Sequence, residues 1–158
     1  MKSFLSLILL TCSLQVFAVD ADQVVGYWWS PEQKSKVQIS KKDDRYFGKI
    51  IAVRPASVDK KDTKNPDKSL QDRKLLGLEI LSGFKFDGDD TWKDGKIYDP
   101  ESGKTYSCKM WFEKDGTLKI RGFVGISLIG RTAEFTKVTG DKPHMRQDNE
   151  PDHIHEHP

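Results

Sequence analysis

The stretch YSCKMWFEKDGTLKIRGFV, residues 106–124, consists of two alternating segments on either side of the pair Asp115-Gly116. An Asp-Gly pair between two such segments is typical of a tight β-hairpin. Alternation with a period of two places successive side chains on opposite faces, so each segment is predicted to be a strand with one buried face. The residues predicted to share that buried face are Tyr106, Cys108, Met110, Phe112, Leu118, Ile120, Gly122 and Val124.

Similar alternation predicts strands in the rest of the chain, separated by turn pairs such as Asp87-Gly88, Asp94-Gly95 and Ser102-Gly103. The further expected strands are residues 24–29, 36–41, 45–53, 78–84, 96–98 and 129–138. One or two helical turns are expected only at residues 69–76, after a long polar loop at residues 55–68. About eight short strands with tight turns predict an all-β fold, an antiparallel barrel or sandwich with at most one short helix.

The two ends of the chain differ from this strand-rich middle. Lys2, the apolar run at residues 4–10 and the small residue Ala18 match a secretory signal peptide that is cleaved after Ala18. An alternative is a lipoprotein signal, with lipid attached to Cys12. We expect residues 1–18 to be a signal peptide, 19–140 a β-barrel domain and 141–158 a disordered tail rich in His and acidic residues. The protein is then exported to the periplasm or beyond, without a transmembrane segment.

Charge and cysteine content narrow the functional classes. The chain has 26 Lys and Arg against 24 Asp and Glu, a net charge of +2, and the two signs are interspersed. Nucleic-acid binding needs a basic stripe, so no nucleic-acid partner is expected. After cleavage Cys108 is the remaining cysteine, and its inward position in the predicted strand indicates a sequestered thiol.

The distribution of histidines argues against the commonest catalytic sites. His144, His153, His155 and His157 all lie in the tail, so the predicted barrel has no histidine for a catalytic triad, a Cys-His dyad or a three-histidine zinc site. No glycine-rich phosphate loop is present either. We therefore expect a non-enzymatic protein without a resident cofactor. Paired carboxylates for glycoside hydrolysis remain the enzymatic alternative. The candidates are Glu79, Asp99, Glu101, Glu113 and Glu134.

An ordered series of short motifs covers nearly the whole predicted barrel, from about Val25 to Val138. They are Gly26-Tyr27-Trp28, Phe47-Gly48-Lys49-Ile50, Asn65-Pro66-Asp67, Leu75-Leu76-Gly77-Leu78, WKDGKIYDP at 92–100, Gly103-Lys104-Thr105-Tyr106, Leu118-Lys119-Ile120-Arg121-Gly122 and Gly130-Arg131-Thr132. This series resembles the DUF2147 family of small exported bacterial proteins of unknown function. The family usually carries a cysteine pair just before its first Gly-x-Ile strand, where this chain has Asp43-Asp44-Arg45-Tyr46.

The resemblance implies a lipocalin-like barrel of the calycin type. Calycins close their barrel with a Gly-x-Trp on the first strand and an arginine on the last strand that stacks on the tryptophan. Gly26-x-Trp28 and Arg131 occupy these positions here. We expect Gly26, Trp28 and Arg131 to be structural closure residues, with the guanidinium over the indole as a cation–π pair.

Two binding functions follow from the aromatic residues. The inward positions Tyr106, Met110, Phe112 and Ile120 line either a packed core or a cavity for a small apolar or amphipathic ligand. The alternative is an envelope module that binds a protein or a glycan through exterior aromatics. The tryptophans considered for that exterior surface are Trp29, Trp92 and Trp111.

A third hypothesis concerns the tail. His153, His155 and His157 alternate along the chain, so an extended segment places three imidazoles on one side, where they could bind Cu(II), Ni(II) or Zn(II) weakly. A solvated tail that merely contains histidine explains the same residues.

The metal hypothesis predicts that full-length protein gives a saturable heat of Cu(II) binding in a calorimetric titration, because neutral imidazoles are good Cu(II) ligands. A variant that ends at Gly140 lacks all four histidines and should give none. Equal heats from the two proteins would remove the histidines from consideration.

Overall fold

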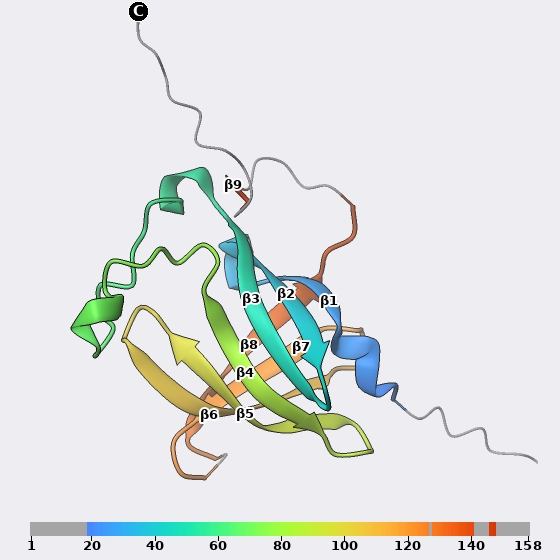
Figure 1. The fold of residues 1–158 in the computed structure, drawn as a ribbon. Coiled ribbons are helices and arrows are strands. Elements are labelled where there is room, and N and C mark those ends of the chain that lie inside the picture. Colours follow the sequence, from blue (N-terminus) through green and yellow to red (C-terminus); the bar gives the residue numbers. More distant parts are fainter. Residues whose placement is uncertain (1–18, 127, 141–145, 148–158) are drawn as a thin grey trace, which may run out of the picture.

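The alternating segments form a closed antiparallel barrel in the computed structural model, which describes residues 19–126, 128–140 and 146–147 (Figure 1). Neighbouring strands follow the order β2-β1-β8-β7-β6-β5-β4-β3, and pairing of β2 with β3 closes the ring. The strands are β1 Gly26–Trp29, β2 Ser35–Lys42, β3 Arg45–Val53, β4 Glu79–Phe86, β5 Thr91–Asp99, β6 Lys104–Phe112, β7 Leu118–Phe123 and β8 Gly130–Lys137. The prediction of an all-β antiparallel barrel of about eight strands is confirmed.

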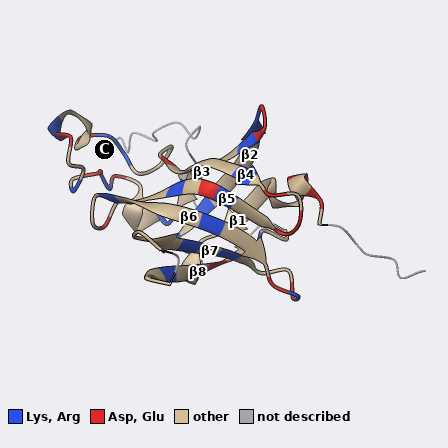
Figure 2. Cartoon of the chain, turned by 90° about the horizontal axis from the view of Figure 1, so that it is seen from below, with Lys and Arg blue, Asp and Glu red and all other residues tan. Residues whose placement is uncertain are grey.

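The remaining elements are short. Among the described residues, the helical ones form the 3-10 turns η1 Ala21–Val24, η2 Pro31–Gln33, η3 Pro55–Ser57 and η4 Lys68–Leu70. No described helix is long and apolar enough to cross a membrane. The two-residue strand β9, Arg146–Gln147, pairs with Val53 and Ala52 of β3, although the sequence predicted no regular structure after residue 140. In Figure 2 Lys and Arg mark several strands of the barrel, whereas most Asp and Glu lie in loops and turns.

Strand β5 differs from its prediction because Asp94-Gly95 does not form a turn. The strand continues through this pair as a bulge, with Asp94 at a φ of 60° and a register shift between Trp92 and Gly95. A bulge of this kind inserts residues without ending the pairing. Trp92 therefore points into the barrel and is 0% exposed. The helical turns expected at 69–76 are reduced to η4, which Asp67 caps through the backbone N–H of Ser69.

One end of the barrel is closed by η1 (blue in Figure 1). The indole N–H of Trp28 donates to the carbonyl of Val24 at 2.9 Å, and the indole N–H of Trp92 donates to the carbonyl of Ala21 at 3.0 Å. The Tyr46 hydroxyl donates to Asp22 Oδ1 at 2.6 Å. These bonds satisfy polar groups that the closed end buries, so η1 acts as the floor of the barrel.

Aromatic side chains fill the interior above this floor. The ring of Trp92 lies 4.9 Å from that of Phe86 and 5.6 Å from that of Phe112, and Phe112 lies 5.7 Å from Trp28. These centroid distances are in the range of favourable tilted and edge-to-face pairs. The closed half of the barrel is therefore a packed core, and it holds Met110 at 0% exposure.

The cation over Trp28 is Lys137, which corrects the expected stacking of Arg131. Strands β1 and β8 pair as the closure model requires, with Trp28 opposite Lys137, and Lys137 Nζ lies 5.8 Å from the centre of the Trp28 ring. Arg131 pairs with Gly122 instead. It precedes Lys137 by six residues in β8, which is about 20 Å at the rise of a strand. The same alternation puts both cations on the inward face, but at opposite ends of the barrel.

The exposure of three other side chains can be compared with its prediction: two differ from it and one agrees. Trp29 was expected on the exterior and is 3% exposed, with Lys36 Nζ 5.1 Å from its ring centre. Val124 was expected on the buried face of the hairpin but lies beyond the end of β7 and is 64% exposed. Cys108 is buried, as predicted, and burial raises the pKa of its thiol to about 12. A thiol in this state is a poor nucleophile.

The packing of β5 generates a prediction at Gly95. A Cβ atom at this position would lie 2.3 Å from the ring of Phe84, which is 0% exposed. We expect Gly95→Ala to lower the free energy of unfolding by about 3 kcal/mol, as overpacking of a rigid core does. Urea denaturation measures this. Lys96→Ala, at the exposed neighbouring position, should cost less than about 0.5 kcal/mol, and equal losses would contradict the steric explanation.

Candidate functional site

The end of the barrel opposite η1 contains a hollow. Here the small side chain of Ala133 leaves space on the inward face of β8. Gly122 of β7 lets Ile97 and Tyr106 pack against the strand, 3.1 and 3.6 Å from where its Cβ would lie. Beside them is a cavity of about 560 Å³, open to solvent on one side. Its lining comes from the ends of β5 to β8 and their loops: Ile97, Tyr98, Asp99, Pro100, Glu101, Tyr106, Ile120, Gly122, Phe123, Val124, Ile129, Gly130, Arg131 and Ala133. We call this space the mouth cavity.

Two of the four residues that were predicted to bind a ligand line the mouth cavity, and the other two lie in the packed core. Tyr106 and Ile120 line the mouth cavity. Met110 and Phe112 lie further along the same inward face, in the packed aromatic half. The interior is thus neither a fully filled scaffold nor a hollow tube, and the side chains that touch the cavity are those nearest the open end.

Arg131 is the basic residue of the cavity lining. It lies on the inward face of β8 at the entrance, and within the described part of the chain its guanidinium makes no hydrogen bond or ion pair. The acidic residues of the lining stand on the opposite rim, in the turn between β5 and β6. Asp99 accepts hydrogen bonds from the N–H of Glu101 at 3.0 Å and the hydroxyl of Ser102 at 2.6 Å. The guanidinium is therefore available to an incoming acceptor, whereas the carboxylate of Asp99 is used by its own turn.

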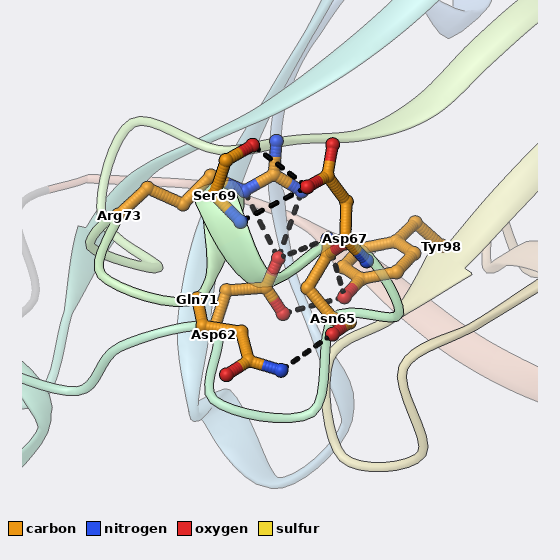
Figure 3. Close-up of polar contacts among 7 residues, drawn as sticks. All are labelled: Asp62, Asn65, Asp67, Ser69, Gln71, Arg73 and Tyr98. Atoms are coloured by element: carbon orange, nitrogen blue, oxygen red, sulfur yellow. Dashed lines mark hydrogen bonds and ion pairs between the residues drawn. The ribbon is translucent and has the colours of Figure 1, made fainter.

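A polar cluster holds the long loop between β3 and β4 beside this rim (Figure 3). At its centre is the carboxylate of Asp62, which is 0% exposed. It accepts hydrogen bonds from the Tyr98 hydroxyl, from Asn65 Nδ2 at 2.8 Å and from Arg73 Nε at 2.9 Å. Since Tyr98 is in β5 and also lines the mouth cavity, these bonds connect the loop to the wall of the cavity. We call this set of residues the Asp62 cluster.

The Asn-Pro-Asp motif shapes the loop around the cluster. Asn65 Oδ1 accepts the backbone N–H of Asp67 at 2.9 Å, and Gln71 Nε2 donates to the carbonyl of Asn65 at 2.8 Å. Gly103, at the end of the β5–β6 turn, packs directly on the loop, because a Cβ atom there would lie 1.8 Å from the carbonyl oxygen of Lys64. The loop and the rim therefore form one hydrogen-bonded unit. The sequence showed the motif but not the buried acid, because Asp62 lies in a polar run without a distinguishing pattern.

The charge state of the Asp62 cluster follows from its hydrogen bonds. Burial by itself raises the pKa of Asp62, but the bonds from Tyr98, Asn65 and Arg73 outweigh it and the pKa is lowered. Burial and the neighbouring carboxylate raise the pKa of Tyr98. Arg73 also lies over the Tyr98 ring, 5.7 Å from its centre. The cluster is thus an ionised acid with matched donors, and no buried side-chain polar atom of the described residues lacks a partner.

The other candidate sites are placed as follows. Glu113 accepts from the Trp111 indole at 3.3 Å, Glu134 pairs with Lys119, and both acids are exposed. Glu79 lines a separate hollow of about 270 Å³ next to the Asp62 cluster. No group of three or more His, Cys, Asp or Glu in the described ranges could hold a metal ion. The tail residues His153, His155 and His157 lie outside the described residues.

Comparison with known proteins agrees with this architecture. The family model for DUF2147, described as an uncharacterized protein conserved in bacteria, matches residues 26–137. The chain belongs to this family. The match runs from the first residue of β1 to the last residue of β8, the two strands that pair in the barrel.

The DUF2147 chain is also similar to a solved structure. Its title reads "Protein HP1028 from the human pathogen Helicobacter pylori belongs to the lipocalin family", and the TM-score is 0.65 at 24% sequence identity, covering 73% of this chain and 82% of that one. At this identity the likeness establishes a lipocalin-like fold. No protein with a curated description matches the chain.

The Asp62 cluster generates a prediction about pH. Because its pKa is lowered on folding, the ionised Asp62 stabilises the protein above the pKa of about 4 of an unfolded carboxyl group, and this contribution is lost as the pH falls through the lower folded value. Asp62→Asn, which leaves Arg73 without its acid, should lower the free energy of unfolding by about 2 kcal/mol near neutral pH.

Urea denaturation of wild type and Asp62→Asn across the acidic range measures this, and the gap between them should shrink at low pH. Asp59→Asn is the control, since that carboxylate forms an exposed ion pair with Lys74 and should cost less than about 1 kcal/mol. A gap of constant size would contradict the ionic role of Asp62.

Proposed function

We propose that this DUF2147 protein is an exported, non-enzymatic binding protein that takes up a small amphipathic ligand in the mouth cavity. The observation that carries the proposal is the hollow itself, which lies above a solid aromatic core. Its volume of about 560 Å³ is within the usual range of small-molecule sites. Its inner wall is apolar, with Ile97, Ile120 and Ala133 facing the space.

The charge of the side chain at the cavity entrance indicates which polar group the ligand carries. The guanidinium of Arg131 lies there without a hydrogen bond or ion pair among the described residues, and a guanidinium matches a carboxylate or phosphate group through two parallel hydrogen bonds. A ligand with an apolar body and an anionic end would therefore bury its body against the half-buried Ile97 and Ala133 and leave its charge at Arg131. The half-buried Tyr106 lies beside the same space and can contact either part.

Export is supported by the sequence of residues 1–18, which has the basic start, apolar run and small residue of a signal peptide. Exterior aromatics do not support the alternative interaction module, because Trp29 and Trp92 are buried in the barrel or against its wall. Trp111 is half-buried beneath Lys109, whose Nζ lies 5.6 Å from its ring centre.

Ala133→Trp tests the cavity by filling it. We expect the affinity for dansylundecanoic acid, a fluorescent fatty acid, to fall by at least about tenfold, because the indole occupies the space of the ligand. Fluorescence titration measures the affinity, and circular dichroism checks the fold. Glu134→Trp is the matched control, since it adds the same side chain to the exposed face of the same strand. The absence of saturable binding to the wild type, or equal losses in both variants, would overturn the proposal.

A further inference from the structure

The loop between β7 and β8 carries the most exposed large apolar side chains of the described residues. Four aliphatic residues stand out, with exposures of 64% for Val124, 61% for Ile126, 82% for Leu128 and 67% for Ile129. The other exposed large apolar residues do not exceed the 48% of Tyr27. Single exposed apolar residues are ordinary, but a contiguous exposed group marks a surface that is covered in use. We call Val124, Ile126, Leu128 and Ile129 the aliphatic tip.

Hydrogen bonds hold the aliphatic tip in its exposed position. The N–H of Val124 donates to the carbonyl of Ile129 at 3.1 Å, and the N–H of Ile129 donates to the carbonyl of Ile126 at 3.1 Å. From the neighbouring strand, Arg121 donates to the carbonyl of Leu128 at 3.1 Å. These bonds involve the backbone of Val124, Ile126, Leu128 and Ile129, so the four exposed side chains stand on hydrogen-bonded backbone at the end of the barrel.

The aliphatic tip adjoins the entrance of the mouth cavity. Val124 and Ile129 belong to its lining, whereas Ile126 and Leu128 do not. In Figure 1 the orange loop between β7 and β8 lies at the opposite end of the barrel from the blue η1. A surface that covers the tip would consequently lie directly at the opening through which a ligand enters.

The charge around the tip is positive. Residues 116–133 contain Lys119, Arg121 and Arg131 but no Asp or Glu. Lys119 is paired with Glu134, and Arg121 donates hydrogen bonds to the Thr132 hydroxyl at 2.9 Å and to the carbonyl of Leu128 at 3.1 Å. Arg121 and Arg131 both keep their positive charge on the two strands that flank the tip. Acidic residues occur across the cavity, where Asp99 and Glu101 form the opposite rim. The β7–β8 side of the mouth is thus apolar at its tip and basic at its base.

We infer that the aliphatic tip docks the protein on a bilayer containing anionic phospholipid, with the mouth cavity at the membrane surface. Aliphatic side chains above a pair of basic residues fit the interface, where apolar groups enter the acyl boundary and cations meet headgroup phosphates. The tip lacks the Tyr and Trp residues that dominate protein contacts. Four side chains also cannot supply the roughly 800 Å² per partner of a stable dimer.

The docking inference deepens the proposed function, and it rests on that function in one respect. If the mouth cavity binds an amphiphile with an anionic end, a docked mouth could exchange that amphiphile with the bilayer without its apolar part crossing water. The source of the ligand would then be the membrane, and its class a fatty acid or another single-chain anionic lipid. The cavity volume of about 560 Å³ suits one short or folded chain.

The experiment uses protein exported by a bacterial host, with its first residue established by mass spectrometry. Flotation with phosphatidylglycerol–phosphatidylcholine vesicles measures docking, and solution titration with dansylundecanoic acid measures the cavity. Ile126→Ser/Leu128→Ser should lower the vesicle partition coefficient by at least about tenfold. Its affinity for the probe in solution should not change, because neither residue lines the cavity. Val25→Ser/Leu70→Ser, which removes two exposed apolar residues elsewhere, should retain docking.

Each outcome has a defined consequence. Failure of the wild type to float, or equal flotation of the two double variants, overturns the docking inference. Flotation that is equal on vesicles of phosphatidylcholine alone overturns the assignment of anionic lipid. A dimer in sedimentation analysis that Ile126→Ser/Leu128→Ser dissolves would identify a second copy as the occupant and also overturn it. If the wild type docks on vesicles but does not bind the probe, the proposed function is contradicted and the docking inference is not.

Discussion

Closure of the eight-stranded sheet is the constraint on which the rest of the structure depends. Once β2 pairs with β3 and β1 with β8, the inward side chains of all strands share one narrow interior. In a barrel of this size, the volume of the inward side chains at each height along the barrel axis decides whether the interior is filled or hollow there. Trp28, Trp92 and Phe112 fill the interior near η1, whereas the small side chain of Ala133 leaves space near the opposite end. The cavity and its floor are thus two consequences of one closed sheet.

The open end is asymmetric, and this asymmetry gives the mouth its chemical character. On one side the Asp62 cluster ties a polar loop to β5 through Tyr98. On the other side the β7–β8 loop presents Leu128 and its aliphatic neighbours to solvent, with Arg131 at the cavity entrance. Hydrogen bonds therefore join loop and wall on the polar side, and exposed apolar surface lies on the basic side, which is the side that the docking inference places against lipid.

Much of the fold could be predicted because it depends on local patterns. The hairpin around Asp115-Gly116 appears with nearly the expected strand ends, and β3 covers the same residues, 45–53, as predicted. Errors arose where one local pattern has two structural outcomes. Asp94-Gly95 is compatible with a turn or a bulge, and only the pairing of β5 with both neighbours selects the bulge. Trp29 lies on the outward face of β1, as expected, but its side chain is only 3% exposed.

The sequence by itself determined an antiparallel all-β fold, most of its inward faces and the absence of histidine from its walls, because alternation and turn chemistry act within a few residues. These patterns left a barrel and a sandwich both open, and the resemblance to the DUF2147 family selected the barrel. It also placed Tyr106 and Ile120 on the face that lines the cavity. Only the tertiary structure decided that Lys137 rather than Arg131 meets Trp28, that Met110 is packed while Ile120 borders a hollow, and that Asp62 is buried. These features depend on the register between strands and on contacts across the closed ring, which join residues far apart in the chain.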